Sequence, residues 1–311
     1  MPSGMSDRRK RLLVNEWEAR TDAALAEAAE RCGVRVFSKV RVADVLDLDR
    51  SGVTNEQYRY GLQAHFDFVI AGLEDTKGQF VVEFDESHHL TDHKTISRDR
   101  LKAEICDRFD FPLIRIGSSY LRRELRFTLI GYLVEVWHLE RAFREAQESG
   151  QIPWDEPFDP ALIVCGSDSI ANVMKGERPK LDFPYWLERP ARLQFVAAEA
   201  KGLVLSRTPE ELVTPWPAHG QPDTAEFIEA WAVMELRYSG YVMGHTMLRN
   251  FKVFVPGVTA RRLAADVAVA DAGRKLERIL GGQEPPNTAE EWAGLRSRTV
   301  GWESQGGVIA R

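Results

Sequence analysis

Acidic side chains lie near the ends of two apolar segments in the first third of the chain. The first segment reads His65-Phe-Asp67-Phe-Val-Ile, and the second, after a turn, reads Phe-Val-Val-Glu83-Phe-Asp85. Alternate residues of a strand share a face, so Glu83 and Asp85 stand together, and Asp67 stands on one face of the neighbouring strand. Clustered carboxylates repel one another, and a divalent cation with a preference for oxygen ligands offsets that cost. The pattern predicts that Asp67, Glu83 and Asp85 hold Mg²⁺ or Mn²⁺, which can activate a water for attack on a phosphodiester.

Two other interpretations of these residues stay open. Each carboxylate could be solvated or salt-bridged, with Arg98 and Arg115 as nearby partners. Four of the seven histidines lie between His65 and His93, so a zinc site that uses this cluster with Cys106 is the rival metal site. Its spacing matches no standard zinc pattern.

The elements that position these residues alternate in type. Hydrophobic periodicity and turn residues predict the order α-β-β-β-α-β, an α/β (α+β) unit complete by about residue 120. A long amphipathic helix follows over 121–149. The predicted elements are a helix at 12–32, strands at 34–45, 63–72 and 79–85, a helix at 97–109 and a strand at 113–116, with loops at 47–60 and 86–96.

The rest of the chain differs in composition. Ten of the 15 prolines lie between Pro153 and Pro222, which predicts short elements. Phe227, Trp231 and Met234 have helical spacing, and a second helix is predicted over 259–280. Residues 236–249 interleave aromatic and basic side chains, which suits either base stacking or a buried helix. The predicted domains are 1–123, a connecting helix at 124–152, a mainly helical domain of open role at 153–282, and a weakly structured tail at 283–311 with a short helix near 288–295.

Composition narrows the classes of function. The chain has 311 residues and a net charge of −6, which argues against a protein that coats nucleic acid by bulk charge. A local basic groove remains compatible, since the part up to Arg123 has 20 basic and 21 acidic residues. No apolar run is long enough for a membrane helix, and no apolar signal core follows the basic start. The three cysteines are far apart, which fits a reducing cytoplasm without membrane attachment.

An ordered set of motifs supports a resemblance over residues 14–123. The set comprises the early-helix Glu18, the His-Phe-Asp-Phe strand, the Val-Glu-Phe-Asp-Glu-Ser-His-His strand end, the Arg-Asp-Arg-Leu-Lys helix and the Pro-Leu-Ile-Arg-Ile strand. This part of the chain resembles the PD-(D/E)XK nuclease superfamily, and within it a bacterial branch related to very-short-patch repair endonucleases. The resemblance implies a restriction-endonuclease-like fold, with a central mixed sheet flanked by helices. It also implies a divalent metal and hydrolysis of nucleic acid, DNA rather than RNA.

Roles follow from this resemblance residue by residue. Asp67 matches the motif aspartate and Glu83 the (D/E) position, which implies that both bind metal. Glu18 matches the helix glutamate that positions metal or water, with Glu16 as the nearby alternative. His89 matches a family histidine, and the resemblance implies a general base or a phosphate contact.

The chain departs from the family pattern at Asp85. The superfamily usually has a lysine there, which orients the attacking water and stabilises developing negative charge. Asp85 cannot do so, and the resemblance implies a further metal ligand instead. Lys102 on the next helix, or Lys39 on the first strand, could supply the missing ammonium. Asp99 also matches the family pattern and could orient His89 or pair with a nearby arginine.

The sequence therefore predicts a metal-dependent nuclease, in a repair, mobile-element or phage-defence setting. The alternative is an inactive nucleic-acid-binding or scaffold module of the same fold, because the Glu-x-Lys lysine is missing. A lysine ammonium close to Asp67 and Glu83 would favour the enzyme. A homodimer fits, since many proteins of this fold cut duplex DNA as dimers. A protein partner could bind through the C-terminal region.

Overall fold

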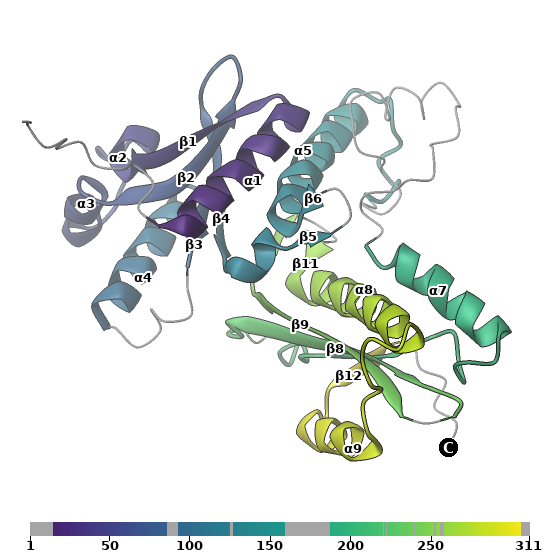
Figure 1. The fold of residues 1–311 in the computed structure, drawn as a ribbon. Helices are drawn as coiled ribbons and strands as arrows, with labels where there is room; N and C mark the ends of the chain where they lie inside the picture. Colours follow the sequence, from purple (N-terminus) through teal and green to yellow (C-terminus); the bar gives the residue numbers. More distant parts are fainter. Residues whose placement is uncertain are drawn as a thin grey trace, which may run out of the picture. The chain divides into compact units, whose positions relative to one another are not determined.

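The computed structural model describes residues 15–85, 93–124, 127–158 and 187–305, apart from 220, 222, 239, 252, 256 and 257. The chain divides into two compact units, residues 1–121 and 122–311 (Figure 1). Each unit is built around its own four-stranded sheet. The α/β class is confirmed, and each unit is described by itself below.

Unit 1 contains a mixed sheet in the order β1-β2-β3-β4. The first three strands are antiparallel neighbours, and β4 runs parallel to β3 because helix α4 carries the chain back between them. This confirms the predicted hairpin of β2 and β3. The elements are α1 (Glu16–Cys32), β1 (Val34–Arg41), α2 (Val42–Val45), α3 (Asn55–Gly61), β2 (His65–Gly72), β3 (Gly78–Phe84), α4 (His93–Arg108), β4 (Leu113–Ile116) and the short 3₁₀ turn η2 (Ser118–Leu121).

Helices cover both faces of this sheet. Helix α1 begins at a cap where the Asn15 side chain accepts a hydrogen bond from the Glu18 amide, and it ends at Gly33, whose φ of 64° suits glycine. Trp17 of α1 stacks on Phe84 with 6.1 Å between ring centroids. On the opposite face, Ile105 of α4 belongs to the same buried cluster as Val81 of β3. The sheet is therefore enclosed between α1 and α4.

Two short helices differ from the sequence prediction. The strand predicted to reach Val45 ends at Arg41, where α2 begins. The predicted loop at 47–60 contains α3, which opens with a reciprocal capping box between Thr54 and Gln57. Helix α3 has only seven residues, most of them polar, so the sequence shows no apolar periodicity from which this helix could be predicted.

Unit 2 pairs an antiparallel sheet with long helices. The sheet order is β12-β7-β8-β9. Helix α8 packs along one face (Figure 1), and Leu295 of α9 packs with Leu212 and Met243 on the other. The elements are β5 (Arg123–Glu124), β6 (Phe127–Thr128), α5 (Leu129–Glu148), α7 (Arg189–Ala200), β7 (Glu210–Val213), β8 (Phe227–Glu235), β9 (Tyr241–Arg249), β10 (Val253–Val255), β11 (Val258–Thr259), α8 (Ala260–Leu280), α9 (Ala289–Arg298) and β12 (Glu303–Gln305).

The helix predicted from Phe227, Trp231 and Met234 is wrong, because this segment is strand β8. Phe227, Trp231 and Met234 are spaced as on a helix. The buried residues on the face toward α8, however, come at every second position, as in a strand. Ile228, Ala230, Ala232 and Met234 are buried. Two of these are alanines, so the period of two was weak in the sequence.

The helical character of the C-terminal region is confirmed for α7, α8 and α9. Residues 283–311 were predicted to be weakly structured. The described part of this tail contains the expected short helix as α9, and also strand β12, which pairs with β7. Among the described residues, no helix combines the length and apolar character that crossing a membrane requires.

Candidate functional site

Four charged residues form a row across the sheet of unit 1. In β2 and β3 the register pairs Phe68 with Val82, which makes Asp67 and Glu83 neighbours across the strands. The amide of Asp67 donates to Glu83 Oε1 at 3.1 Å, and the amide of Phe84 donates to Asp67 Oδ2 at 3.1 Å. Lys39 of β1 and Arg115 of β4 flank this pair. Two adjacent carboxylates thus lie between two cations.

Lys39 joins the sheet to helix α1. Its Nζ donates to Asp67 Oδ1 at 2.6 Å and to Glu18 Oε1 at 2.8 Å. Burial disfavours its charge, but these two carboxylates outweigh that effect and raise the pKa of Lys39. The backbone of Lys39 has a φ of 56°, a left-handed conformation that costs a non-glycine residue about 1 kcal/mol. Strain of this kind is retained where the position of the side chain matters.

Lys102 and Glu83 form a buried ion pair. Lys102 Nζ lies 2.6 Å from Glu83 Oε2 and also donates to the His65 carbonyl oxygen at 2.8 Å. Burial raises the pKa of Glu83 to about 7, against the attraction of Lys102. A buried ion pair contributes little net stability, because desolvation offsets the attraction. Its presence among core residues therefore points to a role other than folding.

Asp85 has a different ion-pair partner from the other two predicted ligands. It faces Arg115, whose Nη1 is 3.6 Å from Asp85 Oδ2 and 3.1 Å from Asp99 Oδ1. Burial disfavours the charge of Arg115, but Asp99 and Glu83 outweigh it and raise its pKa. Within the described residues, no three His, Cys, Asp or Glu side chains are arranged to hold a metal ion. Arg115 is thus the salt-bridge partner of Asp85, and a metal-binding role for Asp85 stays a prediction.

The donor chemistry of Asp67 and Glu83 fits a hard divalent cation. Each carboxylate oxygen has two lone-pair directions, so the hydrogen bonds described above leave acceptor capacity on both groups. Mg²⁺ in proteins commonly takes one or two carboxylates and completes its shell with water and phosphate oxygens. A pair of carboxylates fits that requirement without Asp85.

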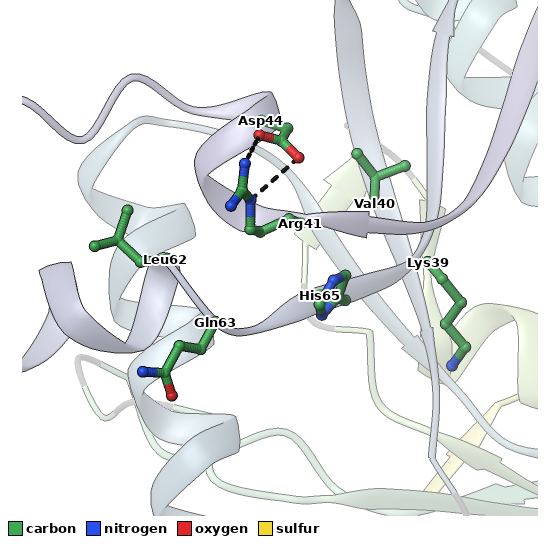
Figure 2. Close-up of a pocket in the computed structure, with 7 residues that line it drawn as sticks. All are labelled: Lys39, Val40, Arg41, Asp44, Leu62, Gln63 and His65. Carbon is green, nitrogen blue, oxygen red and sulfur yellow. Dashed lines mark hydrogen bonds and ion pairs between the residues drawn. The ribbon is translucent and has the colours of Figure 1, made fainter.

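An open hollow of about 710 Å³ adjoins this row. It lies where β1 ends and β2 begins, and Lys39 and His65 line it on the side of the carboxylates. Figure 2 shows Arg41 in a two-pronged contact with Asp44, and the Lys39 side chain pointing away from that pair. The lining residues are Lys39, Val40, Arg41, Asp44, Leu62, Gln63 and His65.

Other predicted residues have different outcomes. His88 and His89 fall outside the described residues. Cys106 belongs to the buried core, and burial together with Glu83 raises the pKa of its thiol to about 12. Cys106 is 1% exposed among apolar side chains, and the zinc alternative that joins it to the histidines stays a prediction, because His88 and His89 fall outside the described residues.

Sequence reasoning missed Tyr60, and it did not name Arg115 as a partner of Asp99. Burial, with a further contribution from Glu83, raises the pKa of the Tyr60 hydroxyl to about 12. Tyr60 was not found because its segment was expected to be a loop. Asp99 pairs with Arg115 rather than with a neighbour on its own helix, and only the parallel pairing of β3 with β4 brings Arg115 there.

The aromatic segment of unit 2 lies on strand β9. The rings of Trp231 and His245 are 4.1 Å apart across β8 and β9, and both contact Glu229 Oε1. Burial lowers the pKa of His245, against the attraction of Glu229. The predicted buried helix is therefore wrong, and base stacking by this segment stays a prediction.

A match to a known protein family covers most of the first unit. Residues 10–131 match one family model. It is described as "Protein of unknown function (DUF2726)". Among curated proteins and among solved structures, the comparisons find no match to this chain. The matched span contains the whole row of charged residues, Lys102 and the hollow.

Proposed function

We propose that this protein is a metal-dependent nuclease that hydrolyses phosphodiester bonds in DNA, with its active site at Asp67 and Glu83. The observation that carries the proposal is the pair of lysine ammoniums, each 2.6 Å from one of two adjacent carboxylates. The motif resemblance to PD-(D/E)XK nucleases supports the same conclusion from the sequence. Lys102 supplies from α4 the positive charge that the family usually carries two residues after the glutamate.

Each residue has a distinct role in this proposal. Asp67 and Glu83 would hold Mg²⁺ or Mn²⁺, which when bound polarises a phosphoryl oxygen and acidifies a water. Lys102 orients Glu83 and places an ammonium beside the reacting phosphate, where it stabilises developing negative charge. Glu18 holds Lys39 in position, and Lys39 in turn fixes Asp67. Arg115 fixes Asp85.

The test is cleavage of plasmid, linear duplex, single-stranded DNA and RNA with Mg²⁺, Mn²⁺ or EDTA. We expect metal-dependent cutting that falls by roughly 10²-fold or more in Asp67→Asn, Glu83→Gln and Lys102→Met. Glu27→Gln is the matched control, because Glu27 is an exposed carboxylate of the same unit paired with Arg31. Mn²⁺ binding by calorimetry should weaken in Asp67→Asn and Glu83→Gln. Cutting that persists in both carboxylate variants would contradict the assignment.

A second candidate is a nucleic-acid-binding module without catalysis. The ion pairs of Lys39 and Lys102 favour it, because they neutralise the carboxylates without any metal. This candidate predicts DNA binding without cutting under every metal condition. It also predicts no Mn²⁺ affinity that depends on Asp67 and Glu83.

A further inference from the structure

We propose that the hollow beside Lys39 holds one nucleotide of a DNA strand, with Arg41 on its phosphate and Leu62 against its sugar or base. This inference rests on the proposed function, because the same strand would continue to the carboxylates. It assigns a binding role to residues outside the row of charged groups.

The lining of the hollow matches a nucleotide in polarity. Arg41, Gln63 and the His65 ring offer hydrogen-bond donors and are exposed. Leu62 is 42% exposed, and Val40 adds further apolar surface to the lining. A nucleotide needs both kinds of contact, since its phosphate is anionic and its sugar and base are largely apolar. A volume of about 710 Å³ is within the range of ligand sites.

The hollow and the candidate active site share two residues. Lys39 lines the hollow and contacts Asp67, while His65 lines it and its carbonyl oxygen accepts from Lys102. A DNA strand that lies in the hollow therefore passes residues that are linked by hydrogen bonds to both carboxylates. This continuity makes a phosphodiester chain a better occupant than an isolated small molecule.

Asp44 offsets the positive charge of Arg41 at the hollow. Arg41 Nη2 lies 2.5 Å from Asp44 Oδ1, and this contact lowers the pKa of Asp44, which keeps it ionised. In the free protein the pair is nearly neutral. A phosphate that binds Arg41 must compete with Asp44, so removal of the Asp44 charge should strengthen binding. Loss of the Arg41 charge should therefore weaken binding and loss of the Asp44 charge should strengthen it, and both directions can be tested.

The experiment is binding of the full chain to short fluorescein-labelled single-stranded DNA, by anisotropy in EDTA across a KCl series. We expect Arg41→Ala to weaken binding roughly threefold to tenfold and to reduce the salt slope by about 0.7. Asp44→Asn should bind about twofold to fivefold more tightly. Both residues are exposed, so both variants should fold, which a thermal melt verifies.

Arg31→Ala is the matched control. Arg31 is an exposed arginine paired with Glu27, about 20 Å along α1 from Glu18, and its loss should leave binding unchanged. Unchanged binding in Arg41→Ala, or weaker binding in Asp44→Asn, would overturn the inference. If the wild type cuts DNA but Arg41 has no effect, only this inference fails. If Arg41 matters for binding but nothing is cut, only the proposed nuclease activity fails, and absence of any binding overturns both.

Discussion

Removal of the Lys102 ammonium should destabilise unit 1 strongly. Glu83 is 5% exposed and Lys102 is 7% exposed, so Lys102→Met leaves a carboxylate buried without its main counter-ion. Breaking a buried pair from one side costs about 3–5 kcal/mol of unfolding free energy. The control Arg100→Met removes a partner from the exposed pair with Glu104 on the same helix and should cost less than about 0.5 kcal/mol.

The pH dependence of this loss follows from Glu83. Burial raises the pKa of Glu83 to about 7 in the folded protein, whereas the unfolded chain has an ordinary value near 4.5. The folded state therefore binds the proton more tightly, and both proteins lose stability as the pH rises from about 4.5 to 7. Loss of Lys102 raises the folded-state pKa of Glu83 further, so the extra loss in Lys102→Met develops above about pH 7, where the wild-type carboxylate is ionised and paired. Lys102→Met should be most destabilising at about pH 8 and less so at about pH 5.5, where Glu83 is neutral.

Hydrogen exchange of peptides from β2 and β3 measures this free energy in unit 1 directly. The double variant Glu83→Gln/Lys102→Met should lie within about 1 kcal/mol of the wild type, because no buried charge is left unpaired. A loss below about 1 kcal/mol in Lys102→Met would refute the reasoning. A double variant as unstable as the sum of the two single changes would also refute it.

Three other changes have clear expected outcomes. Lys39→Gly should be about 1 kcal/mol more stable than Lys39→Ala by thermal melting, because glycine relieves the left-handed backbone; equal stability would contradict this. Burial lowers the pKa of His138 to about 4, so the stability of the wild type relative to His138→Leu should fall by up to about 3 kcal/mol as pH falls from about 6.5 to 4, which calorimetry on both proteins measures. Gly244→Ala should cost about 3 kcal/mol in urea unfolding, because the new Cβ would lie 2.2 Å from the Ala268 carbonyl oxygen, whereas Gly294→Ala in open space should not destabilise.

Much of unit 1 could be predicted because local signals agreed with the fold. The strand at Leu113–Ile116 has the predicted bounds, since Pro112 and Gly117 frame a short apolar run. Asp67 and Glu83 were expected to lie close together because both stand near the ends of two consecutive strands that pair as a hairpin. Helical spacing alone could not decide whether Glu18 faced the site, and the contact through Lys39 depends on how α1 packs.

The remaining features depend on long-range packing. Lys102 and Lys39 were both candidates for the ammonium that the family usually carries at the position of Asp85. In the structure both lysines lie at the site, Lys39 on Asp67 and Lys102 on Glu83. Asp85 shares a strand face with Glu83, but the parallel pairing with β4 places Arg115 beside it. In β8, packing against α8 selected the alanine face over the spacing of the larger side chains.

The two lysines also determine how the site would take up a metal ion. Each lysine already serves as the counter-ion of one carboxylate, so Mg²⁺ held on the remaining lone pairs would join a site whose charge is already balanced rather than a bare acidic cluster. The affinity for the metal ion would therefore be lower than at an unpaired carboxylate pair. A phosphate group bound beside the carboxylates would raise that affinity, because it adds the negative charge that the two ammoniums offset.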